Sequence, residues 1–78
     1  MKLPRVSGKE MIAFLQKQGF DVKRQRGSHV TLYKKSDEGK GLYATVPLHA
    51  NKEIFSGTLL SILKQANITK EEFLKLIK

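Results

Sequence analysis

This 78-residue chain contains no cysteine, so catalysis by a thiol is excluded. Its two histidines are then the side chains best suited to proton transfer. His29 follows a glycine and a serine, and His49 follows Pro47 and Leu48. An imidazole titrates near neutral pH and can therefore take or give a proton in a reaction. The two histidines lie twenty residues apart without a nearby pattern of carboxylates, which is not the spacing of zinc ligands. We therefore expect acid–base chemistry at a histidine, with no metal and no small-molecule cofactor.

Basic residues surround His29 in the sequence. Arg24 and Arg26 precede it, and Lys34 and Lys35 follow it. RNA offers a matching reaction, because its 2′-OH, once deprotonated, attacks the adjacent phosphate. A histidine that takes this proton can cleave RNA without a metal ion when cations hold the backbone and stabilise charge on the phosphate. The alternative interpretation is an ordinary surface histidine among solvated basic side chains.

The other candidate residues would hold RNA rather than react with it. Cations neutralise phosphates, and hydroxyl groups can donate to phosphate oxygens, although in turns and strands they more often bond the backbone. Tyr33 and Tyr43 either stack on bases or stabilise a sheet as a cross-strand pair. His49 is expected to have a structural role near the start of a helix. The predicted RNA-binding residues are Lys23, Arg24, Arg26, Gly27, Ser28, Thr31, Lys34 and Lys35.

The positive charge of the chain is high and unevenly distributed. Fifteen Lys and Arg against seven Asp and Glu give a formal net charge of +8. Residues 1–35 hold nine basic and two acidic residues, a net +7, whereas residues 36–78 hold six and five, a net +1. Such an excess favours an anionic partner, either nucleic acid, an acidic protein or an anionic membrane surface. Because no apolar run approaches the roughly 18 residues that cross a bilayer, and no signal peptide is recognisable, we expect a cytoplasmic protein without a membrane partner.

Capping residues and apolar spacing predict three helices. Ser7 and Glu10 fit a capping box at the start of a first helix, which Gly19 is suited to end. Thr69 and Glu72 fit a second capping box at the start of a short last helix. Between them, apolar residues recur at helical spacing, namely Leu59, Ile62, Leu63 and Ala66.

Three runs of alternating apolar and polar residues predict strands, at residues 20–23, 29–33 and 42–46. Polar turns that contain glycine separate the runs, and Pro47 is expected to end the third strand. We expect a three-residue loop, 26–28, in the first hairpin, because it places the apolar residues of both strands on one face.

This register pairs Gln25 with His29 and Val22 with Leu32. His29 then lies at the start of the second strand and on the face away from the core. The residues expected to share this face are Lys23, Gln25, Thr31, Tyr33, Tyr43 and Thr45.

The element order is a helix, a three-stranded meander, a second helix and a short extra C-terminal helix. This order predicts an α+β domain spanning 1–78, in which helices cover one face of a three-stranded antiparallel sheet. The other sheet face is then open to solvent and carries His29.

Several short motifs, in this order and in so short a chain, resemble the HicA family of RNA-cleaving toxins from toxin–antitoxin pairs. The likeness covers nearly the whole chain. The family usually has glycine at the position where this chain has Asn67. Asparagine also tolerates the left-handed backbone that such a position requires. The motifs are Ser7-Gly8-Lys9-Glu10, Gly19-Phe20, Gly27-Ser28-His29, Val46-Pro47-Leu48-His49, Gly57-Thr58-Leu59, Ile62-Leu63-Lys64-Gln65-Ala66 and Glu72-Phe73-Leu74.

The resemblance implies an α-β-β-β-α sandwich like that of double-stranded-RNA-binding domains, and ribosome-independent cleavage of mRNA. It also implies that His29, in the Gly-Ser-His turn, is the essential histidine, and that a HicB-like antitoxin inhibits the toxin. We expect this antitoxin to cover the His29 face. Two alternatives remain at this point, a non-catalytic RNA-binding module of the same fold and a structural partner of an acidic protein.

Overall fold

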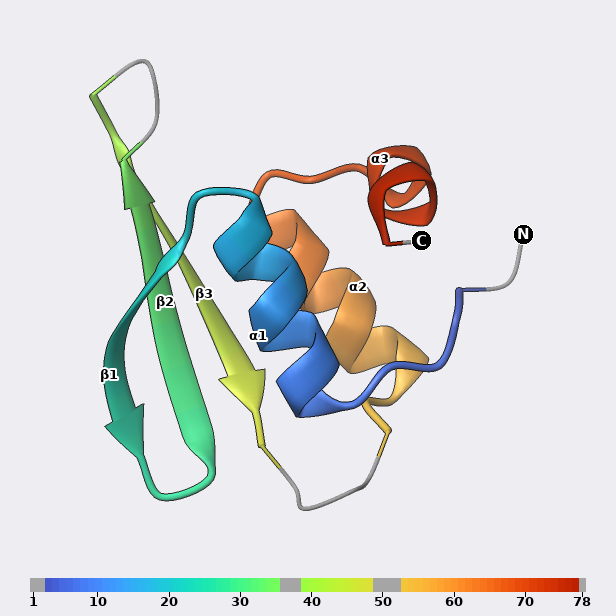
Figure 1. The fold of residues 1–78 in the computed structure, drawn as a ribbon, viewed down its shortest axis with the longest axis horizontal. Coiled ribbons are helices and arrows are strands. Elements are labelled where there is room, and N and C mark those ends of the chain that lie inside the picture. The colour runs from blue at the N-terminus through green and yellow to red at the C-terminus, as the bar shows by residue number, and fades with distance from the viewer. Residues whose placement is uncertain (1–2, 36–38, 49–52, 78) are drawn as a thin grey trace.

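The computed structural model describes residues 3–35, 39–48 and 53–77, and it has the predicted α+β architecture. A three-stranded antiparallel sheet, in the spatial order β1-β2-β3, follows the first helix, and two helices follow the sheet (Figure 1). The elements are α1 (Gly8–Lys17), β1 (Asp21–Arg26), β2 (His29–Lys35), β3 (Gly41–Pro47), α2 (Ser56–Gln65) and α3 (Lys70–Leu76).

Both predicted capping boxes are present. The Ser7 hydroxyl accepts a hydrogen bond from the Glu10 backbone N–H at 3.2 Å, and the Glu10 carboxylate accepts one from the Ser7 N–H at 3.0 Å. Thr69 and Glu72 make the same reciprocal pair at the start of α3. Each box satisfies backbone donors that the first turn of a helix leaves unpaired, which is typically worth about 1 kcal/mol.

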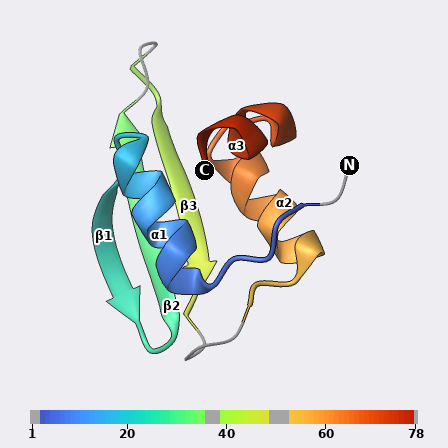
Figure 2. The same cartoon turned by 45° about the vertical axis from the view of Figure 1, so that its right-hand side comes forward.

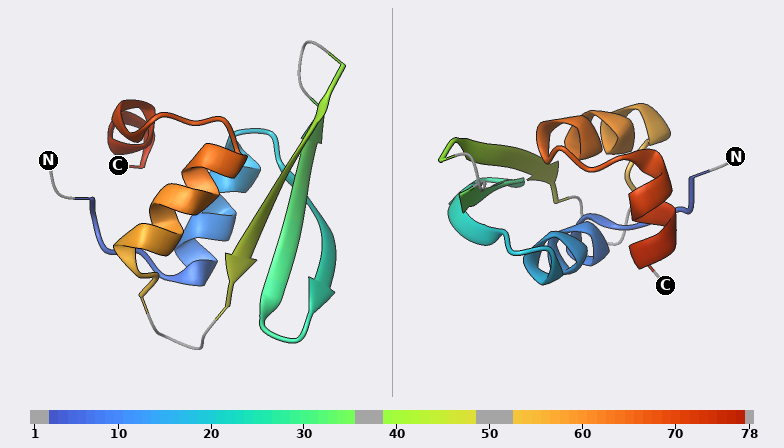
Figure 3. Two further views of the ribbon diagram at one scale, coloured as in Figure 1. Left: turned by 180° about the vertical axis from the view of Figure 1, so that it is seen from behind. Right: turned by 90° about the horizontal axis from the view of Figure 1, so that it is seen from above.

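The helices form one layer and the sheet forms the other. Helices α1 and α2 lie side by side on one face of the sheet (Figures 2 and 3). Helix α3 packs beside them, and the Phe73 ring meets the Phe14 ring edge-on, with centroids 5.0 Å apart. The core between the layers consists of Val6, Met11, Phe14, Leu15, Phe20, Val30, Leu32, Ala44, Val46, Leu59, Ile62, Leu63, Ala66 and Phe73.

The register of the first hairpin differs from the predicted one. Arg26, not Gln25, pairs with His29, so the loop has two residues rather than three. The predicted pairing of Val22 with Leu32 is nevertheless present. A β-bulge at Lys23 reconciles the two observations, because an extra residue in one strand changes the alternation of faces by one.

The end of β3 is held close to the start of the first helix and to the turn before His29. Gly8, the first residue of α1, packs so tightly on the backbone of Pro47 and Leu48 that an added Cβ would overlap the Pro47 carbonyl oxygen. The Leu48 N–H donates a hydrogen bond to the Ser28 carbonyl, which joins the end of β3 to the turn before His29.

Among the described residues, no helix is long and apolar enough to cross a membrane.

Candidate functional site

His29 is exposed and is the first residue of β2, as predicted. Its strand partners are Arg26 in β1 and Pro47 in β3, so the imidazole lies at one end of the sheet between two paired neighbours. Gly27 precedes it in the turn with a φ of 54°, a left-handed conformation that a residue with a Cβ rarely adopts. The backbone of this turn therefore sets the position of His29.

The bulge at Lys23 determines which cations share the face of His29. Because Arg26 pairs with His29 and Arg24 pairs with Thr31, both arginines lie on the outer face of the sheet, away from the helices. Gln25, which was predicted to lie there, instead pairs with Val30, a core residue. The difference replaces one neutral side chain by two arginines whose Cα atoms are about 7 Å apart along the strand.

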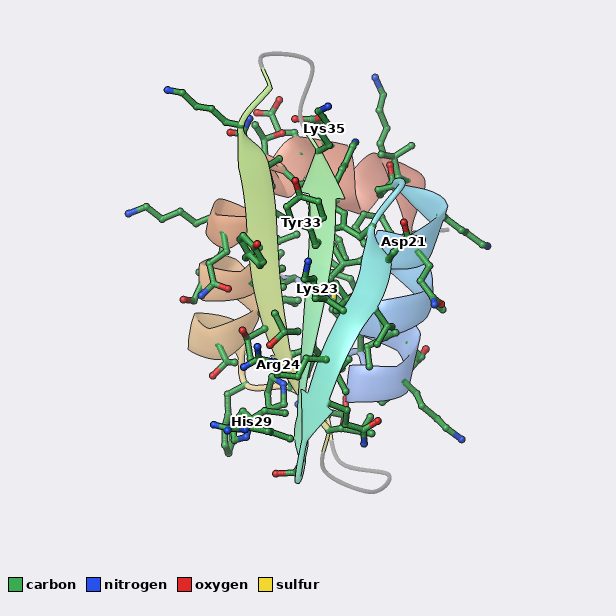
Figure 4. The ribbon with its side chains drawn as sticks, turned by 90° about the vertical axis from the view of Figure 1, so that its left-hand side faces the viewer. Asp21, Lys23, Arg24, His29, Tyr33 and Lys35 are labelled. Carbon is green, nitrogen blue, oxygen red and sulfur yellow. The ribbon has the colours of Figure 1, made fainter. Side chains whose placement is uncertain are left out.

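Figure 4 looks directly at this outer face, with the sheet in front of the helices. His29 and Arg24 lie near one end, Lys23 and Tyr33 lie farther along, and Lys35 lies at the other end. Lys35 is six residues from His29 on the same strand, which corresponds to about 20 Å. It therefore shares the face of His29 but is remote from it.

The remaining predicted RNA-binding residues are divided between two faces. Thr31 lies on the outer face, where its hydroxyl is 3.5 Å from that of Thr45, and Ser28 is half-buried in the turn. Lys34 pairs with Leu42 and extends toward the helices, with its Nζ 5.9 Å from the centroid of the Phe20 ring. Lys34 is thus separated from His29 by the sheet.

The charges on the outer face are almost all positive. Lys23, Arg24 and Arg26 are all exposed, and Asp21 is the acidic residue of β1. Within the described part of the chain, none of these three cations forms an ion pair; the pair found there joins Arg5 to Glu53, at 4.0 Å. The cations beside His29 are therefore available to neutralise an anion.

The His29 ring itself makes no hydrogen bond within residues 3–35, 39–48 and 53–77. The same residues contain no cluster of three carboxylates or histidines that could hold a metal ion. His49, which we expected to be structural, lies outside the described residues.

The bulge at Lys23 was not predicted, although the sequence contains a signal for it. A two-residue Gly-Ser turn and the pairing of Val22 with Leu32 are incompatible in a regular ladder, and an extra residue in β1 satisfies both. The predicted register had no bulge. Arg24 and Arg26 were therefore predicted as phosphate contacts because they are basic, and not because they share a sheet face with His29.

The family model described as the HicA toxin of bacterial toxin–antitoxin matches residues 8–68 of this chain. The match extends from the start of α1 to the segment after α2 and contains the whole sheet. No curated protein matches the chain.

Proposed function

The chain belongs to the HicA family of toxins from bacterial toxin–antitoxin systems, and on that premise we propose that it is an mRNA interferase. This endoribonuclease cleaves mRNA independently of the ribosome and without a metal ion, and His29 is its catalytic residue. An antitoxin is the natural partner of such a toxin, and we assign this role to a HicB-like protein.

One observation carries the proposal. His29 is exposed at the end of a sheet face that no described helix covers, with Arg26 directly opposite it and Arg24 on the same face. No described carboxylate neutralises these guanidinium groups. A cationic surface of this kind attracts a phosphate backbone, and a nearby imidazole supplies the proton transfer that RNA cleavage needs.

In the proposed reaction, His29 takes the proton of a ribose 2′-OH. The 2′-oxygen attacks the adjacent phosphorus, the bond from phosphorus to the 5′-oxygen breaks, and that oxygen leaves with a proton. The imidazolium formed in the first step can supply this proton. Arg24 and Arg26 stabilise the charge that develops on the phosphate oxygens. The products are a 2′,3′-cyclic phosphate and a 5′-hydroxyl end.

The experiment is cleavage of a purified mRNA by the purified protein in the presence of EDTA, followed by analysis of the new ends. We expect unchanged cleavage with EDTA and 2′,3′-cyclic phosphate ends. A 2′-O-methyl group at one cleavage site should abolish cutting there and leave the other sites intact. Continued cleavage at the methylated site would exclude attack by the 2′-OH.

Expression in bacteria separates this function from the alternatives. A nuclease toxin should arrest growth and shorten cellular mRNA, and co-expression of the antitoxin should restore growth. An RNA-binding module without catalysis, or a structural partner of an acidic protein, would leave mRNA intact.

A further inference from the structure

Two tyrosines form an aromatic pair on the outer face of the sheet. Tyr33 in β2 and Tyr43 in β3 are direct strand partners, and their ring centroids lie 4.9 Å apart at an interplanar angle of 54°. Tyr33 is half-buried, whereas Tyr43 is 53% exposed. The pair therefore presents one aromatic ring to solvent and supports it with the other.

The neighbours of Tyr33 hold its ring in place. The Lys23 Nζ lies 5.2 Å from the centroid of the ring, within the range of a cation–π contact. On the same face, the ring also covers the backbone of Gly41 at the start of β3, where an added Cβ would overlap ring atoms. These contacts restrict the Tyr33 side chain before any ligand binds. Tyr33 therefore supports Tyr43 and loses little further conformational freedom when a ligand stacks on the pair.

Sheet stability explains only part of this arrangement. A cross-strand aromatic pair stabilises a sheet by packing the two rings together. It does not require that more than half of Tyr43 stay exposed, on a face that also carries Lys23 and Arg24. Exposed aromatic rings interleaved with cations are the pattern that binds single-stranded nucleic acid, because bases stack on the rings while cations follow the phosphates.

We propose that Tyr43, supported by Tyr33, stacks on a base of single-stranded RNA whose backbone passes over Lys23 and Arg24 to reach His29. The inference rests on the proposed function and adds the form of the substrate. A duplex keeps its bases stacked inside and offers none to an aromatic ring on an open sheet. The substrate is therefore an unpaired stretch of mRNA.

The strand geometry limits how far the stacked base lies from the cleaved bond. Tyr33, the partner of Tyr43, is four residues from His29 along β2, which corresponds to about 13 Å. Nucleotides in a stacked strand are about 3.4 Å apart, and an unstacked strand is longer, so at most about four nucleotides separate the two positions.

The chain offers a direct spectroscopic test, because it has two tyrosines and no tryptophan. Its intrinsic fluorescence therefore reports on this pair alone. We would titrate the protein with a 2′-O-methyl oligonucleotide, which is not cleaved, and with a strand of the same length that lacks bases. We expect the first to quench the tyrosine fluorescence and the second to bind without quenching, because only a base can stack.

Variants then locate the effect. Tyr43→Leu should weaken binding of the single strand by about 5- to 150-fold, which is the range for loss of one base–aromatic stack. Tyr43→Phe should bind like the wild type. Phe55→Leu is the matched control, because Phe55 is 83% exposed but lies at the start of α2, outside the sheet face.

The outcomes distinguish this inference from the proposed function. Cleavage by the wild type, together with equal binding by Tyr43→Leu and the wild type, would overturn the stacking proposal and leave the nuclease intact. Equal binding of a duplex and a single strand would also overturn it. A wild-type protein that binds the single strand but does not cleave RNA would contradict the proposed function and leave the stacking site standing.

Discussion

The residues beside His29 differ in how directly they can act on a phosphate. Arg26 is its strand partner and lies on the same face, whereas Lys34, five residues farther along β2, extends to the opposite side of the sheet. Both residues are cationic and lie within five positions of His29 in the sequence, so charge and proximity in the sequence do not show which one shares its face. Only the register of the strands and the alternation of faces do so.

Arg26→Ala and Lys34→Ala form a matched pair that tests this distinction. Each removes one positive charge from an exposed or half-buried position of the sheet. Arg26→Ala should lower RNA affinity and reduce the slope of log K against log salt concentration by about 0.7, which corresponds to one phosphate contact with a single strand. Lys34→Ala should leave the slope unchanged. Binding titrations at several salt concentrations measure both, and equal slopes for the two variants would contradict the assignment of faces.

Among the elements, the first hairpin positions the site, and the first helix packs against the end of β3 that pairs with His29. The bulge at Lys23 turns Arg24 and Arg26 to the face of His29, and the left-handed Gly27 closes the turn. Helix α1 begins directly against the end of β3, where Gly8 contacts the backbone of Pro47. The helix start and the His29 end of the sheet are therefore packed as one unit.

Two glycines in the first turns of their helices should respond in opposite ways to alanine. Gly57→Ala in α2 should raise the free energy of unfolding by about 0.5–1 kcal/mol, because nothing lies within 4 Å of the added Cβ and alanine favours the helix. Gly8→Ala should lower it, because the added Cβ overlaps the Pro47 carbonyl oxygen. Urea denaturation followed by circular dichroism measures both changes. Stabilisation by Gly8→Ala would show that α1 can move away from β3 at no cost.

For the whole molecule, the two-layer arrangement separates the core from the binding surface. The helices cover one face of the sheet and leave the other open, and the open face carries Lys23, Arg24, Arg26 and His29. We propose that this one surface serves both RNA and the antitoxin. Competition for that surface would inhibit the toxin without any change in its fold.

Charge reversal tests whether the two partners share the face. Arg24→Glu with Arg26→Glu should weaken both RNA and antitoxin binding by about tenfold or more. Lys64→Glu with Lys75→Glu makes the same change of charge on exposed positions of α2 and α3 and is the control. Calorimetry with the antitoxin and anisotropy with RNA measure the two affinities. An antitoxin that binds the arginine double variant at full strength must inhibit the toxin at another surface.

The sequence predicted the fold class and both capping boxes, because these depend on local chemistry at fixed spacing. It also placed His29 at the start of a strand and on the outer face. It did not predict that Arg26, rather than Gln25, lies opposite His29, because a single bulge changes the register without changing the apolar pattern on the core side. Lys34 was grouped with the RNA-binding residues by its charge alone, although the regular alternation of β2 places it on the same side of the sheet as Leu32.

The most direct test of His29 as the catalytic residue is the single-turnover rate at which His29→Ala cleaves an RNA oligonucleotide in the presence of EDTA. Circular dichroism would first establish that the variant is folded, as expected for a change at an exposed residue. We expect the rate to fall by about 100-fold or more relative to the wild type, because general acid–base catalysis contributes at least that factor, while RNA affinity changes little. Cleavage by His29→Ala at the wild-type rate would contradict this assignment.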